Sequence, residues 1–382
     1  MGSPNSLRIL HVSEVHWGGV VVLLRHFAAE QIAQGHEVHV LAHPDMPDLG
    51  PGVTIHRWHL DRRRPNTYLK AIRQYHAAVR VVVPDVVHVH SFVAGFLCRF
   101  PLTKPPRSAP VVYQPHAWAD TVSSNPVISA TVRQSERLSA RRTDLVVANC
   151  EDELRRGEAL GVRVPGRALG VTVDLAMFRP PTPAERESAR RALGLTEERI
   201  ALILGRLVRQ KGQDLLLPVW AAHRPANTTL ALVGPGDPGW VEHFAGSQWG
   251  RTVVAPGPTD NVLPWLWAAD VLVLCSRYET VGLVVAEAMS VGLPVVATRV
   301  DGAQEVLRDG VEQPAGVVVE SADMEGLIRE LTRRLEDSDL HRSEAAAGPL
   351  RAKVRFAPNA VAERLVAAYR EAIKYADERK GL

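Results

Sequence analysis

The sequence predicts an α/β protein of two domains, each built around a mostly parallel β-sheet. Short, continuously apolar runs rich in β-branched residues alternate with helical stretches along the chain, which is typical of βαβ units whose strands are buried on both faces. The length of 382 residues fits two or three domains of about 150 residues each. A segment rich in prolines and charges, residues 178–187, divides the runs into two series, because it can continue neither a sheet nor a helix core.

The predicted strands follow one another in a regular order. The first series covers residues 7–13, 37–42, 53–57, 85–90, 111–114 and 144–149. The second series covers residues 200–204, 229–233, 253–255, 270–275, 295–298 and 316–319. We therefore place a first domain at residues 1–178 and a second at residues 184–357. A final amphipathic helix is predicted over residues 358–374, where a proline stands at the helix start.

Charge and cysteine content narrow the class of protein. The formal net charge of +3 is too small to indicate nucleic-acid binding, and it fits an anionic small ligand or a weak contact with an acidic membrane surface. The three cysteines are far apart and have no metal-binding spacing, so we expect buried thiols in a reducing compartment. No signal-peptide pattern and no apolar run of about 20 residues is visible, so we expect a cytoplasmic protein.

The first candidate for ligand binding is the pair Gly18-Gly19, between the predicted strand 7–13 and an apolar helical stretch. Glycines at such a turn allow the backbone to approach a ligand, and the helix N-terminus offers amide groups to an anion. The same pair is equally typical of a tight strand-to-helix turn without a ligand.

A pair of cations forms the second candidate. Gly205 and Arg206 follow the predicted strand 200–204 directly, and Lys211 comes five residues later. The carboxyl ends of parallel strands are where open α/β sheets bind ligands. A guanidinium fork together with an ammonium group suits a diphosphate. The alternative is two solvated loop cations, which the position after the strand disfavours.

The third and strongest candidate is a pair of glutamates. Glu279 lies in the loop after the predicted strand 270–275, and Glu287 lies about one turn inside the following helix. A carboxylate accepts two hydrogen bonds and so suits a vicinal diol, such as that of a ribose or a hexose. The amides at the helix start would face phosphate, and they belong to Thr280, Val281, Gly282 and Leu283. Two surface glutamates are the alternative reading.

These motifs together resemble those of a known family. The block from Glu279 to Glu287 resembles the Glu-x7-Glu signature of the family 4 retaining glycosyltransferases. The loop with the two cations resembles that family's diphosphate-binding segment. His116, after the predicted strand 111–114, resembles its N-domain histidine. The resemblance is dense over residues 200–310 and looser over residues 7–178.

The resemblance implies the GT-B fold, in which two Rossmann-like domains with parallel sheets face each other across a cleft. The N-terminal domain would bind the acceptor, and the C-terminal domain would bind the nucleotide sugar. The C-terminal helix, residues 358–382, would pack back on the N-terminal domain. The fold class that we predict is therefore α/β with GT-B architecture.

The resemblance also implies roles for the candidate residues. Arg206 and Lys211 would bind the diphosphate, with help from the backbone at Gly205 and at residues 280–283. Glu287 would bind the ribose, and Glu279 and His116 would contact the donor hexose. The Gly18-Gly19 pair would lie near the diphosphate or the acceptor.

The reaction implied is transfer of a hexose with retention of its anomeric configuration. A nucleoside diphosphate sugar is the expected donor, with UDP favoured, and the acceptor is a hydroxyl of a glycan, a lipid-linked molecule or a small secondary metabolite. No cofactor and no metal is expected, since the two cations would neutralise the leaving diphosphate. Expected partners are thus the donor and the acceptor, with a peripheral membrane contact left open and no nucleic acid.

Two departures from the family pattern stand out. Val281 occupies a position where family members usually carry an aromatic residue, and the stretch 170–174 lacks the family's Asn-Gly. Three alternatives remain. One is a hydrolase or epimerase of the same fold, and another is a non-catalytic nucleotide-sugar binding protein. A dinucleotide-dependent dehydrogenase is disfavoured, because the turn at Gly18-Gly19 lacks the third glycine of G-x-G-x-x-G.

Overall fold

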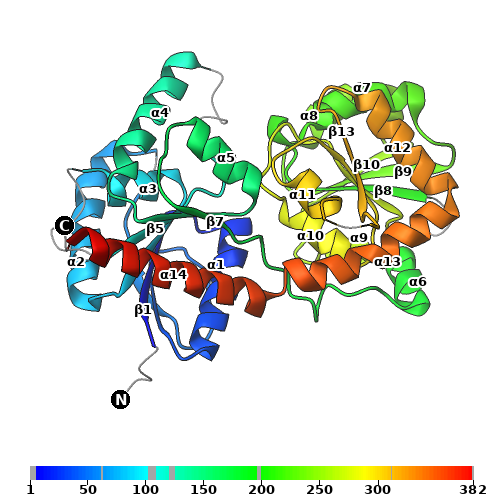
Figure 1. The fold of residues 1–382 in the computed structure, drawn as a ribbon. Coiled ribbons are helices and arrows are strands. Elements are labelled where there is room, and N and C mark those ends of the chain that lie inside the picture. The colour runs from blue at the N-terminus through cyan, green and yellow to red at the C-terminus, as the bar shows by residue number, and fades with distance from the viewer. Residues whose placement is uncertain are drawn as a thin grey trace. The chain divides into compact units, whose positions relative to one another are not determined.

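The computed structural model describes residues 6–61, 63–101, 109–119, 125–195, 199–310 and 312–380. The chain divides into two compact units (Figure 1). Unit 1 comprises residues 1–172 and 358–382, and unit 2 comprises residues 173–357. The division thus falls at Thr172, a little before the proline-rich segment that begins at residue 178.

Unit 1 is built around a seven-stranded sheet in the order β3-β2-β1-β4-β5-β6-β7, in which every pairing is parallel. Its strands are β1 (Arg8–Ser13), β2 (Glu37–Ala42), β3 (Thr54–Arg57), β4 (Val86–His90), β5 (Val111–Gln114), β6 (Leu145–Ala148) and β7 (Gly166–Ala168). The strand that the sequence did not predict is β7. It is short, lies at the sheet edge and contains no apolar run, so no pattern marks it.

Helices connect and cover these strands. They are α1 (Gly19–Ala33), the 3-10 helix η1 (Pro65–Thr67), α2 (Tyr68–Val82), α3 (Phe92–Arg99), α4 (Pro126–Ala140), α5 (Glu151–Ala159) and α14 (Pro358–Lys380). The last of them, α14, lies beside α1 and against β4, β5 and β6 (Figure 1). Its buried face includes Val361, Leu365 and Tyr369. The C-terminal helix is therefore part of the core of unit 1.

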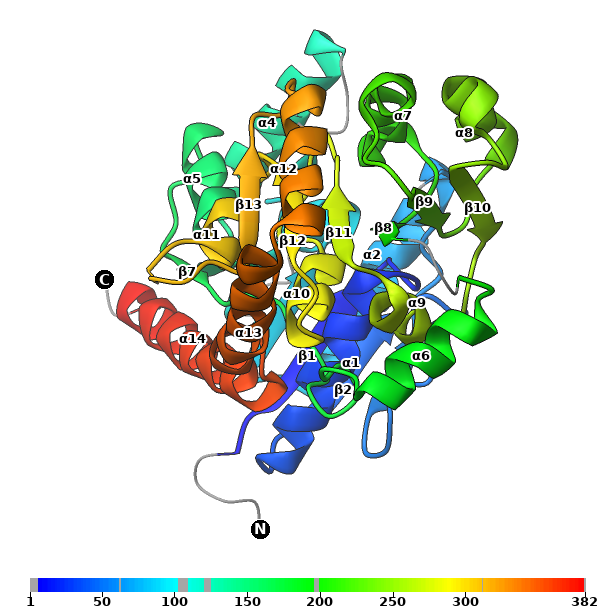
Figure 2. The same ribbon diagram turned by 90° about the vertical axis from the view of Figure 1, so that its right-hand side faces the viewer.

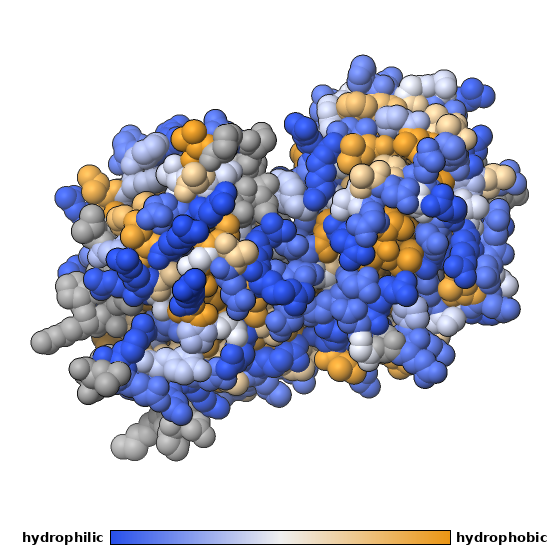
Figure 3. Space-filling model, turned by 45° about the horizontal axis from the view of Figure 1, so that its top comes forward, coloured by the Kyte–Doolittle hydropathy of each residue, from blue (hydrophilic) through white to orange (hydrophobic). Residues whose placement is uncertain are grey.

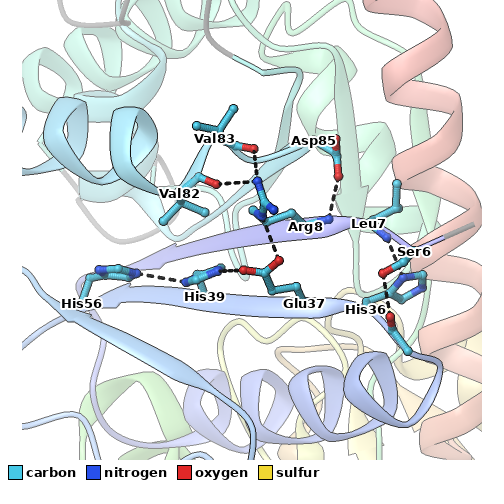
Figure 4. A network of polar contacts seen from close by, with 11 residues as sticks. Ser6, Leu7, Arg8, His36, Glu37, His39, His56, Val82, Val83 and Asp85 are labelled. Carbon is cyan, nitrogen blue, oxygen red and sulfur yellow. Dashed lines mark hydrogen bonds and ion pairs between the residues drawn. The ribbon is translucent and has the colours of Figure 1, made fainter. Parts of the chain in front are cut away.

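A polar network closes the amino-terminal edge of this sheet (Figure 4). The Arg8 side chain bonds Glu37 at 2.9 Å and the carbonyl of Val82 at 3.1 Å. Glu37 also bonds His39, which in turn bonds His56. The network links β1, β2, β3 and the end of α2, and it leaves the opposite, carboxyl edge for other groups.

Unit 2 contains a six-stranded sheet in the order β10-β9-β8-β11-β12-β13, again with parallel pairing throughout. Its strands are β8 (Arg199–Leu204), β9 (Thr228–Val233), β10 (Val253–Gly257), β11 (Val271–Leu274), β12 (Val295–Thr298) and β13 (Gly316–Val319). Each coincides with a predicted strand, with ends that differ by at most two residues.

The helices of unit 2 surround this sheet (Figure 2). They are α6 (Pro183–Ala192), α7 (Gln213–His223), α8 (Pro238–Ala245), α9 (Leu263–Ala268), α10 (Leu283–Ser290), α11 (Ala303–Leu307), α12 (Met324–Glu336) and α13 (Ser338–Arg355), with the 3-10 helices η3 (Arg209–Lys211) and η4 (Gly246–Gln248). Helix α7 packs against α12, and α10 packs against α13. The central strands β8, β9, β11 and β12 are buried from both sides, which explains their continuous apolar character.

The strand order reverses once in each unit. In unit 1 the chain runs outward from β1 to β3 and then returns to place β4 on the other side of β1. In unit 2 it runs from β8 to β10 and then places β11 beside β8. Such switch points leave a crevice at the carboxyl ends of the two central strands, where open α/β sheets bind their ligands. Gly18 follows β1 at the first switch point, Lys211 and Glu279 follow β8 and β11 at the second, and His116 follows β5, the neighbour of β4.

Candidate functional site

The loop after β8 has a conformation that requires glycine at its end. Gly212 adopts φ +74° and starts α7. A Cβ atom on Gly212 would lie 1.9 Å from the carbonyl oxygen of Cys275, the residue after β11. The loop from β8 and the loop from β11 are therefore in direct backbone contact. This contact brings Lys211 to the loop that carries Glu279.

Lys211 and Glu279 form a short ion pair at the switch point of unit 2. The distance between Lys211 Nζ and Glu279 Oε1 is 2.6 Å, and the side chains are only 15% and 11% exposed. The same Glu279 oxygen accepts a hydrogen bond from Ser276 Oγ at 3.1 Å. An ammonium group has three protons to donate, so the pair fixes the position of Lys211 and leaves it able to bind anionic oxygens.

Arg206 lies on the same loop and is exposed. Its guanidinium donates to Gln210 Oε1 at 3.1 Å, and Gln210 donates to the carbonyl of Tyr278 at 3.2 Å. The Arg206 carbonyl accepts from Gln213 at 3.0 Å. Both cations predicted from the sequence are thus linked to the β11 loop, Lys211 directly and Arg206 through a glutamine.

The segment between the two glutamates is held in an unusual backbone conformation. Val281 is buried and adopts φ +52°, which is strained for a β-branched residue and costs roughly 1–3 kcal/mol. Its amide donates to the carbonyl of Asp301 at 3.1 Å. Gly282 follows, and α10 begins at Leu283. The strained turn therefore sets the direction in which the first amides of α10 point, as anion binding at a helix start requires.

Glu287 lies one turn inside α10, as the sequence predicted. Its side chain is partly buried, and within the described part of the chain its carboxylate makes no hydrogen bond. Burial raises the pKa of Glu287 from 4.5 to about 7. A carboxylate with no partner on the protein suits an acceptor of hydroxyl groups from a ligand.

This pKa predicts how donor binding depends on pH. The resemblance implies that Glu287 accepts hydrogen bonds from two donor hydroxyls, and both of its oxygens are full acceptors only when it is ionised. On that role, affinity for a UDP-sugar should rise about tenfold between pH 6 and pH 8, as the carboxylate loses its proton near pH 7. Glu287→Gln should bind more weakly and without this dependence. Isothermal titration with UDP-glucose, whose phosphates do not titrate in this range, measures both.

A stability measurement provides the control. Because the folded-state pKa of Glu287 is raised, the wild type should lose stability as pH rises from 4.5 through 7, and Glu287→Gln should lose less over that window. Parallel pH profiles of affinity for the two proteins would rule out Glu287 as the group responsible.

In unit 1 the predicted residues lie at the carboxyl edge of the sheet. Gly18 caps α1 with φ +72°, and open space surrounds the position of a Cβ atom there. His116 follows β5 in a left-handed conformation, φ +58°, and its Nε2 lies 2.9 Å from His90 Nδ1. Burial lowers the pKa of His116 to about 3, so its ring is neutral at physiological pH.

Several residues of the site were not predicted from the sequence. Ser276 contacts Glu279, and Gln210 and Gln213 join the two loops. Arg277 bonds both carboxylate oxygens of Asp214, at 2.6 and 2.8 Å. The bonds of Gln210 and Arg277 join segments more than 60 residues apart in the sequence, so no local pattern could mark them.

The sequence Asp337-Ser338-Asp339 has the Asp-x-Asp form that can hold a metal ion, but the structure gives it another role. Asp337 Oδ1 accepts from the amides of Asp339 and Leu340 at 3.1 and 3.0 Å, which caps α13. Asp339 pairs with Arg342. These aspartates are therefore explained as a helix cap.

The fold is that of the GT-B glycosyltransferases. Sucrose-phosphate synthase from Thermosynechococcus elongatus aligns with a TM-score of 0.82 over 96% of this chain and 99% of that one, at 22% sequence identity. HepE from Anabaena, solved in complex with UDP and glucose, aligns with a TM-score of 0.75 at 20% identity, over 94% of this chain and 98% of that one. At these identities the likeness establishes the architecture.

Sequence comparison establishes the family. The model of the glycosyl transferases group 1 matches residues 198–337, and that of the glycosyl transferase 4-like domain matches residues 18–169. A D-inositol 3-phosphate glycosyltransferase of Catenulispora acidiphila is 33% identical over 317 residues, 76% of this chain and 73% of the relative. Another, of Thermobispora bispora, is 28% identical over 94% of this chain and 90% of the relative. The chain belongs to the family 4 glycosyltransferases.

Helix length and surface hydropathy describe the exterior of the protein. Among the described residues, no helix has the length and apolar character needed to cross a bilayer. The face drawn in Figure 3 is largely hydrophilic, with apolar residues in small groups.

Proposed function

We propose that this glycosyltransferase transfers a hexose from a UDP-hexose donor to a hydroxyl group, with retention of the anomeric configuration. The observation that carries the proposal is the Lys211–Glu279 ion pair at the switch point of unit 2. It lies with the start of α10 at the carboxyl ends of β8 and β11, with Glu287 one turn further on. This set matches a diphosphate flanked by two sugar rings.

In the proposed reaction the bond between the hexose C1 atom and the leaving diphosphate oxygen breaks. The acceptor oxygen forms a bond to C1 on the same face, and its proton passes to the leaving diphosphate. Lys211 and Arg206 stabilise the negative charge that develops on that diphosphate, which is the part of the reaction where fixed charges have the largest effect. Glu279 positions Lys211 and accepts hydrogen bonds from hexose hydroxyls. No metal ion enters this scheme.

The names of the relatives indicate which acceptor to test first. The relatives named above act on D-inositol 3-phosphate by their names, which makes this molecule the first acceptor to test. A glycan, a lipid-linked acceptor and a small secondary metabolite are the other classes. His116 in unit 1 is proposed to accept a hydrogen bond from a substrate hydroxyl.

A thermal-shift panel of UDP-, GDP-, ADP- and TDP-sugars tests the donor. A ligand that binds only the native state raises the midpoint by mass action, so UDP-hexoses should give the largest shift. Once an acceptor that the enzyme uses is known, NMR of the product should show that the transferred hexose keeps the anomeric configuration it had in the donor. Rapid consumption of donor alone would indicate a hydrolase, and binding without turnover of any acceptor would indicate a binding protein.

A further inference from the structure

Unit 1 contains a cluster of four histidines, of which only His116 has a role in the proposed function. His11 lies on β1, and His88 and His90 lie on β4. His11 is paired in register with His88, and residues 88 and 90 point to the same face of the sheet. These three side chains are fully buried. Buried polar rings at this density require defined hydrogen-bond partners.

Three hydrogen bonds join His116 to the interior of the unit. His116 Nε2 lies 2.9 Å from His90 Nδ1, and His90 Nε2 lies 3.0 Å from His11 Nδ1. At the inner end, His11 Nε2 lies 2.9 Å from Gln31 Oε1. We call His116, His90, His11 and Gln31 the histidine relay. The two inner rings use both of their nitrogens within it.

Neutral rings make the relay directional. Burial lowers the pKa of His11 to about 4 and that of His116 to about 3. Burial also holds the pKa of His90 well below its usual value. A neutral imidazole has one N–H donor and one acceptor nitrogen, so the protons must all point inward, toward Gln31, or all point outward.

A second set of contacts selects the inward order. Gln114 donates to Asn149 Oδ1 at 2.9 Å, which leaves its carbonyl oxygen as an acceptor beside His88. Burial lowers the pKa of His88, and the interaction with Gln114 opposes this effect. His88 Nε2 and Gln114 Oε1 are buried and have no hydrogen-bond partner among the described residues, and an N–H on Nε2 would be the donor that complements this acceptor. His88 Nδ1 is then an acceptor for the Tyr369 hydroxyl, 2.7 Å away.

Tyr369 passes this order to the relay. Because its hydroxyl donates to His88, it must accept from Gln31 Nε2, which lies 3.3 Å away. The Oε1 atom of Gln31 is therefore the acceptor for His11 Nε2–H. Each following ring then donates inward, and the last donor is Nε2–H of His116.

We propose that Gln31, His11 and His90 are positioning residues that hold His116 as the neutral Nε2–H tautomer, with Nδ1 as its acceptor. This inference rests on the proposed function in one respect, the substrate hydroxyl that Nδ1 accepts. The side chain of Tyr369, on α14, fixes the order from the far end. His116 is thereby prevented from presenting a donor on Nδ1 in place of an acceptor.

Nitrogen-15 NMR of the histidine-labelled, full-length enzyme measures the tautomer directly. The His116 signals are assigned by their loss in His116→Asn. We expect the His116 proton on Nε2 at pH 7. A proton on Nδ1, a mixture of tautomers or a charged ring would overturn the proposal. The nitrogens of His11, His88 and His90 lie within 4.8 Å of one another, so Zn²⁺ should also be added. If these rings already gave signals typical of metal-bound histidine in protein to which no Zn²⁺ had been added, that result would contradict the relay as well.

Tyr369→Phe tests the link between tautomer and activity with little change in volume. Loss of the hydroxyl frees the Gln31 amide to rotate, so His116 should become a tautomer mixture. We expect kcat/KM to fall about tenfold, the scale typical of losing a group that orients an active-site ligand. Tyr75→Phe is the matched control, since Tyr75 is equally buried in unit 1 and its hydroxyl has no hydrogen-bond partner among the described residues. It should keep both the tautomer and the turnover.

The two readouts separate this inference from the proposed function. A single Nε2–H tautomer in an enzyme that turns over no UDP-hexose would count against the function and leave the relay intact. Full turnover in Tyr369→Phe with an unchanged tautomer would overturn the relay and leave the function intact.

Discussion

Lys211→Ala should reduce turnover by about a thousandfold, the upper range for removing one group that stabilises developing negative charge. Lys211 Nζ is held at 2.6 Å from Glu279 and is largely shielded from water, so water cannot replace its charge efficiently. Arg206 lies on the same loop but is exposed, and we expect its loss to cost less. Initial rates with a UDP-hexose and an acceptor that the wild type uses measure the fall in turnover.

The control for this variant is Lys353→Ala. It removes the same charge from unit 2 at an exposed position on α13, and it should leave the rate unchanged. Among the residues that the structure describes, Glu279 would retain only Ser276 as a partner in Lys211→Ala. A lower melting temperature is therefore expected without loss of the fold, which circular dichroism checks. Near-normal turnover in a folded Lys211→Ala protein would refute the proposed role of this lysine.

Glu136→Ala should destabilise unit 1 by about 3–5 kcal/mol, the cost typical of leaving one partner of a buried ion pair alone. Arg99 and Glu136 are 0% and 1% exposed, and their charged groups are 2.8 Å apart. Glu136 also accepts from the Tyr113 hydroxyl at 3.0 Å, and the Arg99 guanidinium lies 3.3 Å above the Tyr113 ring. Urea unfolding followed by tryptophan fluorescence measures the change.

Replacing both partners distinguishes a lost attraction from an uncompensated charge. Arg99→Met with Glu136→Leu removes the two charges together and should be much less destabilising than Glu136→Ala alone. If the single variant lost less than about 1 kcal/mol, the guanidinium would have to be reached by water, contrary to its burial in the structure.

The parallel sheets were predictable because burial on both faces leaves a continuous apolar run in each central strand. Strands β2, β5, β12 and β13 begin and end where the sequence predicted. The edge strand β7 (Gly166–Ala168) has no such run and was missed. Glu136 illustrates the limit for side chains. Its neighbours on α4 are polar and suggest a solvated helix face, and only the packing of α3 against α4 shows that it is buried.

The candidate site was predictable where chemistry lies next to a strand end. Lys211 and Glu279 each follow a central strand, so the rule for switch points marks both. Their direct ion pair was not foreseen, because it depends on the contact between the backbone at Gly212 and Cys275. The histidines of β4, His88 and His90, have no role that the sequence indicates. Their hydrogen-bond network joins two strands, two helices and the loop after β5, an arrangement that no sequence spacing encodes.

A crystal structure of the enzyme soaked with UDP-glucose would show which residues hold the donor. We expect diphosphate oxygens within hydrogen-bond distance of Lys211 Nζ and the Arg206 guanidinium, and ribose hydroxyls on Glu287. A donor bound elsewhere, or no donor at the carboxyl ends of β8 and β11 at saturating concentration with both cations turned away, would refute the proposed role of these residues.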